Sequence, residues 1–328
     1  MKRTKSSWLI VILCLLLTLC VFASCNDTPS VDNSKDSDEI IDSTPTSDNA
    51  VDKAGDQVTD STPTSDTEPE EEEDLSKLSN EQLLARIAKK IENSDNYTIF
   101  TIGDSVTYGY KTSGNDFTYT AQFAKMLGEQ LKEKTIIRYD GDSASLNPPL
   151  VYENPTTVQT GTTDEKITVV RSGVCGDTIK LIIDRQSDFI NKEIDGKTGD
   201  LFIISTGIND AGINGPKYVP LTEYKTYLKS LVATIKENHP NADVIFMTPT
   251  YFGSTGKPLD PYAKRMTLAG AELHVGVIDL HKLWMDHWVE GAEHYGQGDW
   301  LTTDDCHPSD IACVAMAEEM MHCLFGNK

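Results

Sequence analysis

Ser105, Asp304 and His307 are residue types that carry out nucleophilic catalysis when they meet in space. Ser105 follows an apolar run and lies between Gly103 and Gly109, which predicts a tight turn with the hydroxyl at the end of a strand. Asp304 and His307 are three residues apart, so the carboxylate can accept from one ring nitrogen while the other faces Ser105. Taken singly, each has a commoner explanation, as a turn serine or as a capping aspartate beside a surface histidine.

Asn209 and Gly176 could supply hydrogen-bond donors for the same chemistry. Asn209 follows another apolar run, and an amide side chain at that place can donate to a developing oxyanion. Gly176 follows a further run, and a glycine lets a backbone N–H approach a substrate closely. An Asx turn and an ordinary turn glycine are the commoner explanations of these two residues.

Short apolar runs alternate with helical periodicity and would position these groups. Nearly continuous apolar runs are typical of parallel strands that helices cover on both faces. The runs that we expect to be strands are 97–103, 167–171, 201–206, 243–247 and 275–280. The pattern predicts a three-layer α/β/α sandwich with a mostly parallel, five-stranded, flavodoxin-like sheet. Because parallel strands end at one edge, the candidate groups should meet there.

Together, these motifs resemble the SGNH hydrolases, the GDSL-type esterase family, over residues 97–325. The matching segments are 103–105, Gly176, 207–210 and 304–307. The resemblance implies that Ser105 is the nucleophile and that Asp304 orients the base His307. It also implies an oxyanion hole made by the N–H groups of Ser105 and Gly176 and the side-chain amide of Asn209.

The chain departs from the family pattern at Val106, Cys175 and Asp305. Asp305 is a second acid beside Asp304 and leaves open which carboxylate faces His307. By resemblance, the enzyme is a carboxylic ester hydrolase that works through an acyl-enzyme on the serine.

We expect no organic cofactor and no metal. His281, His287 and His294 lack carboxylate or cysteine partners at metal-ligand spacing. The cysteines of the C-terminal part of the chain match neither a zinc pattern nor a disulfide framework, so we expect structural thiols. These cysteines are Cys175, Cys306, Cys313 and Cys323.

The N-terminus is predicted to be an export signal. A basic start precedes an apolar run of 16 residues, 8–23, which is shorter than the roughly 20 residues that span a bilayer. Residues 22–25 resemble a bacterial lipobox, in which the cysteine carries the lipid. Residues 1–25 are therefore expected to be a lipoprotein signal peptide with lipidation at Cys25. Plain cleavage and a membrane anchor are the alternatives.

Charge separates a linker from the domain. The chain carries a net charge of −22, which argues against a nucleic-acid binder. Residues 26–76 contain 17 acidic residues against two lysines and no aromatic residue, which predicts a disordered acidic linker. Residues 77–328 are then the hydrolase domain. We expect a monomer, anchored to the outer face of the cytoplasmic membrane or to the cell envelope.

The substrate is predicted less directly. The polar stretch 139–166 and the aromatic residues of 284–300 could rim the site, with Tyr108 and Trp300 as wall candidates. Trp284 and Trp288, four residues apart, could instead form a packed helix face. We expect the removal of acetyl or other short acyl groups from a carbohydrate or a cell-envelope polymer. A lysophospholipase or thioesterase, and a catalytically silent glycan-binding lipoprotein, are the alternatives.

Overall fold

The structure is a computed structural model that describes residues 74–142, 149–212, 218–251, 259–294 and 296–326. The expected signal peptide 1–25, Cys25 and the linker up to residue 73 lie outside the described residues. The first described element is a short 3-10 helix, Leu75–Lys77. In the described part of the chain, no helix combines the length and the apolar character that a membrane span needs.

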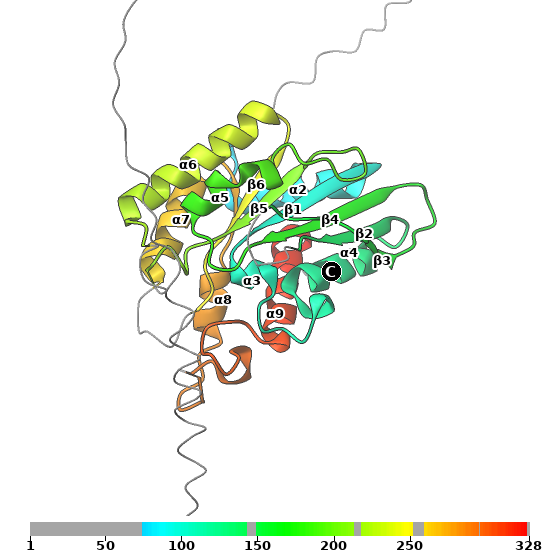
Figure 1. The fold of residues 1–328 in the computed structure, drawn as a ribbon. Helices are drawn as coiled ribbons and strands as arrows, with labels where there is room; N and C mark the ends of the chain where they lie inside the picture. The colour runs from blue at the N-terminus through cyan, green and yellow to red at the C-terminus, as the bar shows by residue number, and fades with distance from the viewer. Residues whose placement is uncertain (1–73, 143–148, 213–217, 252–258, 295, 327–328) are drawn as a thin grey trace, which may run out of the picture. The chain divides into compact units, whose positions relative to one another are not determined.

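A seven-stranded sheet forms the centre of the domain, in the order β3-β2-β4-β1-β5-β6-β7 (Figure 1). Neighbouring strands run parallel except β2 and β3, which pair antiparallel. The strands are β1 (Asn96–Gly103), β2 (Thr135–Asp140), β3 (Thr156–Gln159), β4 (Lys166–Gly173), β5 (Leu201–Ser205), β6 (Asp243–Met247) and β7 (Gly276–Ile278). The predicted α/β sandwich with a mostly parallel sheet is confirmed.

The predicted number of five strands is wrong, because β2 and β3 extend the sheet beyond β4. The five expected strands form one continuous part of the sheet, β4-β1-β5-β6-β7. β3 is a half-exposed edge strand of four residues, so it carries no apolar run. Its place depends on pairing with β2 and on Gln159, whose amide donates to the carbonyl oxygens of Leu131 and Lys134 at 3.1 Å. Part of the polar stretch 139–166 is therefore sheet, and residues 143–148 within it lie outside the described residues.

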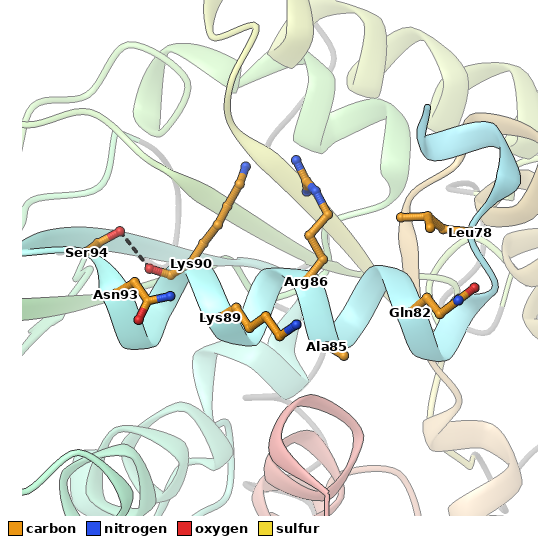
Figure 2. Close-up of a pocket in the computed structure, with 8 residues that line it drawn as sticks. All are labelled: Leu78, Gln82, Ala85, Arg86, Lys89, Lys90, Asn93 and Ser94. Carbon is orange, nitrogen blue, oxygen red and sulfur yellow. Dashed lines mark hydrogen bonds between the residues drawn. The ribbon is translucent and has the colours of Figure 1, made fainter. Parts of the chain in front are cut away.

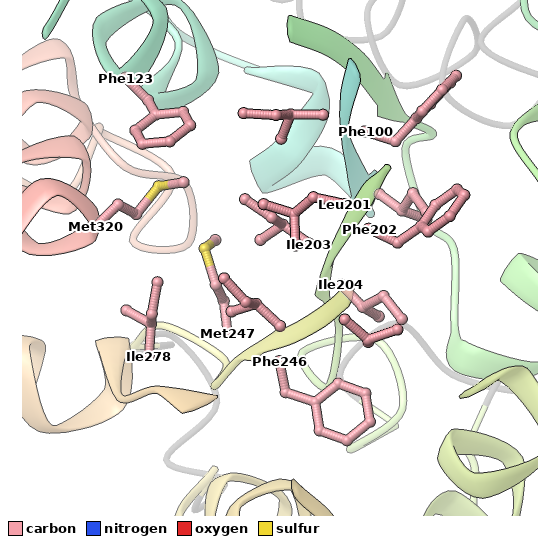
Figure 3. Packing of buried hydrophobic residues seen from close by; sticks show 14 of the residues in the cluster. Phe100, Phe123, Leu201, Phe202, Ile203, Ile204, Phe246, Met247, Ile278 and Met320 are labelled. Atoms are coloured by element: carbon pink, nitrogen blue, oxygen red, sulfur yellow. The ribbon is translucent and has the colours of Figure 1, made fainter. Parts of the chain in front are cut away.

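Helices cover both faces of the sheet (Figure 1). One layer contains α2 (Asn80–Asn93), α4 (Tyr119–Gln130) and α9 (Asp310–Phe325), and the other contains α5 (Ile179–Asp184), α6 (Leu221–Asn238) and α7 (Asp260–Leu273). Successive strand residues point to opposite faces, so each strand supplies both cores. Ile203 and Met247 point toward Met320 of α9, whereas Phe202 and Phe246 lie on the other side of their strands (Figure 3).

A surface cavity of about 570 Å³ lies along α2 (Figure 2). Arg86 and Lys90 line it and pair with Asp243, at 2.8 and 2.7 Å. Asp243 is the first residue of β6, so this cavity lies toward the amino ends of the strands. It is therefore away from the edge at which the candidate catalytic groups were expected.

Candidate active site

The turn after β1 presents Ser105. Asp104 caps the one-turn helix α3 (Ser105–Tyr108), and its carboxylate accepts a hydrogen bond from the Val106 N–H at 2.9 Å. Gly109 ends α3 in the left-handed conformation, with φ of +82°. This strand, turn and helix place the Ser105 side chain at the carboxyl end of β1, as the motif predicted.

Ser105, His307 and Asp304 form a continuous hydrogen-bonded chain. The Ser105 Oγ lies 2.8 Å from His307 Nε2, and His307 Nδ1 lies 2.8 Å from Asp304 Oδ2. An ionised Asp304 can only accept, so Nδ1 carries the ring proton and Nε2 can accept from the serine hydroxyl. The structure thus joins residues that are 202 positions apart in the sequence.

Asp304 is held as a carboxylate by several donors. Its Oδ1 accepts from the Thr302 hydroxyl at 2.9 Å and from the N–H groups of Cys306 and His307 at 3.0 Å. Burial by itself would raise the pKa of Asp304, but the hydrogen bonds from His307 and Thr302 outweigh it and lower the pKa to about 2. Asp304 therefore stays ionised throughout the neutral and mildly acidic pH range.

Asp305 points to a different partner. Its Oδ1 lies 2.5 Å from His294 Nδ1, and its backbone has a φ of +55°. The left-handed backbone turns the two adjacent carboxylates apart. The question that the sequence left open is thereby answered, because in this structure Asp304 is the acid that faces His307.

The two other predicted oxyanion donors are the Asn209 side chain and the Gly176 N–H. They lie on two loops that are hydrogen-bonded to each other. The Asn209 amide donates to the carbonyl oxygen of Asp177 at 2.8 Å, one residue beyond Gly176. Asp210 accepts from the Ile179 N–H at 2.9 Å and so joins the same two loops. Gly176 has a φ of +81°, which glycine adopts without strain. The loops after β4 and β5 are therefore locked to each other beside the carboxyl end of β1.

Two residues that sequence reasoning missed complete this arrangement. Arg185 is buried, pairs with Asp177, and donates to the carbonyl oxygens of Gly103 at 3.2 Å and Ser172 at 3.0 Å. It therefore joins the ends of β1 and β4 to the turn that contains Gly176. The Tyr110 ring lies edge-on to the His307 ring, with centroids 4.9 Å apart. The only local signal for Tyr110 is its place in the turn after Ser105.

Of the two predicted wall residues, Trp300 is buried, whereas Tyr108 is partly exposed beside the turn that carries Ser105. Trp300 is only 9 % exposed; its ring stacks on His287 at 3.6 Å and meets Trp284 edge-on at 5.3 Å. It is part of the core under the catalytic loop and not an exposed wall. Tyr108 is partly exposed, and the Arg171 guanidinium lies 5.3 Å from its ring centre. Trp284 is fully buried, as a packed helix face predicts, whereas Trp288 is 50 % exposed.

The three histidines that could suggest a metal have separate partners. His281 contacts Asp260 at 3.3 Å, His287 stacks on Trp300, and His294 pairs with Asp305. Across the described ranges, no group of three or more histidine, cysteine or acidic side chains is arranged to hold a metal ion. The cysteines Cys175, Cys306, Cys313 and Cys323 are free thiols.

Two buried carboxyls behind the nucleophile make stability depend on pH. Burial raises the pKa of Asp104 to about 7 and that of Asp210 to about 6. Both pKa values are higher than the value of roughly 4 that an aspartate has in an unfolded chain. The folded state therefore binds more protons than the unfolded state between about pH 4 and pH 7. The stabilisation is complete below about pH 4 and is lost as the pH rises through 6 to 7.

We therefore expect the free energy of unfolding to fall by on the order of 4 kcal/mol between pH 5 and pH 8 through these two groups. Urea titrations at both pH values measure it. Asp104→Asn keeps an oxygen for the Val106 N–H but cannot ionise, so it should reduce the fall. Replacement of the exposed Glu290 by Gln is the control. Equal pH slopes in wild type and Asp104→Asn would contradict the assignment.

Comparisons with known proteins agree with this fold and identify the family. The sequence model of the GDSL-like lipase/acylhydrolase family matches residues 101–312. The structure is similar to that of an acetyl xylan esterase, AlAXEase, with a TM-score of 0.51 and 16 % identity over 70 % of this chain and 100 % of that one. It is also similar to a two-domain esterase (CEX) active on acetylated mannans, with a TM-score of 0.52 and 15 % identity over 74 % of this chain and 52 % of that one. No curated protein sequence matches the chain. The match over most of the folded domain shows that the chain belongs to the GDSL-like lipase/acylhydrolase family.

Proposed function

We propose that the protein is an extracytoplasmic serine esterase that removes acetyl or other short acyl groups from a carbohydrate of the cell envelope or its surroundings. The observation that carries this proposal is the continuous hydrogen-bonded chain from Asp304 through His307 to Ser105. A serine activated in this way, beside fixed donors, is equipped for acyl transfer.

In the first half of the reaction, His307 Nε2 takes the hydroxyl proton of Ser105 as Oγ attacks the ester carbonyl carbon. The carbonyl oxygen becomes an oxyanion, which the N–H groups of Ser105 and Gly176 and the Asn209 amide stabilise. The imidazolium then gives its proton to the sugar oxygen as the C–O bond breaks. The alcohol leaves, and the acyl group stays on Ser105 as an ester.

In the second half, water replaces the sugar hydroxyl. His307 takes a proton from the water as its oxygen attacks the acyl carbon, and returns that proton to Ser105 Oγ as the acyl-enzyme bond breaks. The ionised Asp304 stabilises the imidazolium in both halves and holds the ring in the reactive orientation. The net reaction consumes one ester and one water, releases the sugar hydroxyl and the carboxylic acid, and returns the three side chains to their starting state.

The charge of the surrounding surface favours a neutral substrate. Glu290, Glu293 and Asp299 are exposed on the segment that leads into the catalytic loop, whereas Asp286 pairs with Lys282. Carboxylates around a site repel phosphate groups and other anions, which disfavours a phospholipid. The two similar esterase structures are named for acetylated xylan and acetylated mannans, which is consistent with a neutral acetylated polysaccharide here.

Export and tethering complete the proposal. The lipobox-like residues 22–25 would place a lipid on Cys25, and the acidic linker to residue 76 would extend the domain away from the membrane through charge repulsion. A tethered enzyme of this kind meets polymers at the cell surface. Metabolic labelling with a fatty-acid analogue, in wild type and in Cys25→Ala, tests the lipidation.

The ester preference tests the function. The full-length chain, solubilised in mild detergent, is assayed with p-nitrophenyl acetate, butyrate and octanoate. We expect kcat/KM to be highest for acetate and to fall with chain length. A preference for octanoate would instead support the lysophospholipase or thioesterase alternative. Failure to cleave any ester, with retained glycan binding, would support the catalytically silent alternative.

A further inference from the structure

Two aromatic side chains outside the catalytic chain form an edge-to-face pair. The ring centres of Tyr251 and Trp288 are 6.3 Å apart, with the planes at 69°. Trp288 is 50 % exposed and Tyr251 is partly exposed. Trp288 follows α8 (Leu280–Asp286), and Tyr251 follows β6 by four residues. The pair therefore presents a flat apolar indole face to solvent beside a second ring with a polar hydroxyl.

The fold places Tyr251 on the catalytic edge of the sheet. β6 lies beside β5 and parallel to it, so the segments after both strands leave from the same edge. Pro249, two residues before Tyr251, lies in close contact with Gly207, two residues before Asn209. The segment that carries Tyr251 therefore runs along the loop of the proposed oxyanion donor.

The segment that carries Trp288 contacts the catalytic loop. Its ring packs so closely on Gly296 that a Cβ there would come within 2.8 Å of the ring. The Val289 N–H donates to the Gly296 carbonyl at 2.8 Å, and His294 pairs with Asp305 at 2.5 Å. Asp305 directly follows Asp304. The second histidine–aspartate pair thus anchors the segment that carries Trp288 to the loop that carries the acid and the base.

We propose that Trp288 and Tyr251 form a subsite for a pyranose ring of a neutral oligosaccharide, one that is next to the acylated sugar unit. A pyranose has an apolar face of C–H bonds and a rim of hydroxyls, which suits a flat aromatic ring with polar neighbours. The exposed carboxylates of Glu290 and Glu293 lie on the same segment, so they can accept from sugar hydroxyls. They would repel an anionic ligand.

This inference deepens the proposed function and rests on it for the identity of the acylated unit. The subsite would not bind the acyl group. It would make the enzyme prefer oligomers over small esters, because sugar rings beyond the scissile ester would contribute binding energy.

Binding and specificity test the subsite separately. The full-length protein and its Trp288→Ala variant are titrated calorimetrically with unacetylated xylohexaose and mannohexaose. We expect the variant to bind at least one of them about tenfold more weakly, equivalent to about 1.4 kcal/mol. Trp288→Phe should recover part of the affinity. Leu268→Ala on α7, which also removes an exposed apolar side chain, is the matched control and should bind as wild type does.

The second readout is the ratio of kcat/KM for an acetylated xylo-oligosaccharide to kcat/KM for p-nitrophenyl acetate. We expect this ratio to fall about tenfold in Trp288→Ala. His294→Ala should lower it too, since the segment would lose its anchor. An unchanged ratio together with unchanged oligosaccharide binding would overturn the subsite. Absence of all ester hydrolysis in wild type would overturn the esterase proposal instead, while Trp288-dependent sugar binding would still support the subsite.

Discussion

Replacing Ser105 by alanine should lower kcat for p-nitrophenyl acetate by roughly 10⁴- to 10⁶-fold, the range found when a hydrolase loses its nucleophile. The Ser105 hydroxyl is hydrogen-bonded to His307 Nε2 at 2.8 Å, so no neighbouring hydroxyl can substitute for it without moving the base. Pre-steady-state kinetics with ester in excess should also lose the burst of nitrophenol that acyl-enzyme formation produces in wild type.

The control for this prediction is Ser79→Ala. Ser79 caps α2 in a capping box, so its replacement should lower the free energy of unfolding by about 1 kcal/mol and leave kcat unchanged. A serine-reactive phosphonate should label wild type and Ser79→Ala but not Ser105→Ala. Substantial activity or labelling in Ser105→Ala would mean that another residue is the nucleophile.

Replacing Asp304 by asparagine should lower kcat by about 10³- to 10⁴-fold. The asparagine amide can donate to His307 Nδ1, which would move the ring proton to Nε2 and leave that nitrogen unable to accept from Ser105. Asp305→Asn is the matched control, since it is the same change one residue away on a carboxylate that faces His294. We expect a far smaller loss of kcat in that variant.

The comparison of the two asparagine variants needs a check on folding. Thermal unfolding should show that both variants retain the wild-type structure at the assay temperature. KM for p-nitrophenyl acetate should change less than kcat in Asp304→Asn, because Asp304 acts through His307 and does not contact the ester. Equal losses in the two variants, or a larger loss in Asp305→Asn, would refute the assignment of the acid.

The pH dependence of stability and the catalytic chain involve different carboxyls. Asp304, with a pKa of about 2, is ionised wherever the enzyme can work. Asp104, adjacent to Ser105, has a pKa of about 7 because it is buried. Hydrogen bonds thus lower one pKa and burial raises the other, although both residues flank the same site. Changes in activity between pH 5 and 8 should therefore be compared with the change in stability over the same range.

The residues of the candidate site could be predicted to lie together because their sequence signals are local. Ser105, Asn209 and Gly176 each follow an apolar run, and parallel strands end at one edge, so their proximity followed from the fold class. Asp304 and His307 are close in the chain, and the loop before the last helix had to return to that edge. The structure places all five residues around the carboxyl ends of β1, β4 and β5.

The sequence by itself therefore determined the parallel α/β core, the family and the chemical groups of the site, since apolar periodicity and short motifs record local geometry. Only the tertiary structure decided which acid faces His307, that β2 and β3 extend the sheet, and that Trp300 is buried while Trp288 is exposed. These features depend on contacts between segments far apart in the chain: the pairing of an edge strand, the partner of Asp305 and the packing of indoles under a loop. Such contacts produce no periodic pattern of apolar residues in the sequence. The burial of a residue in an edge strand or a loop depends on which other segment packs against it.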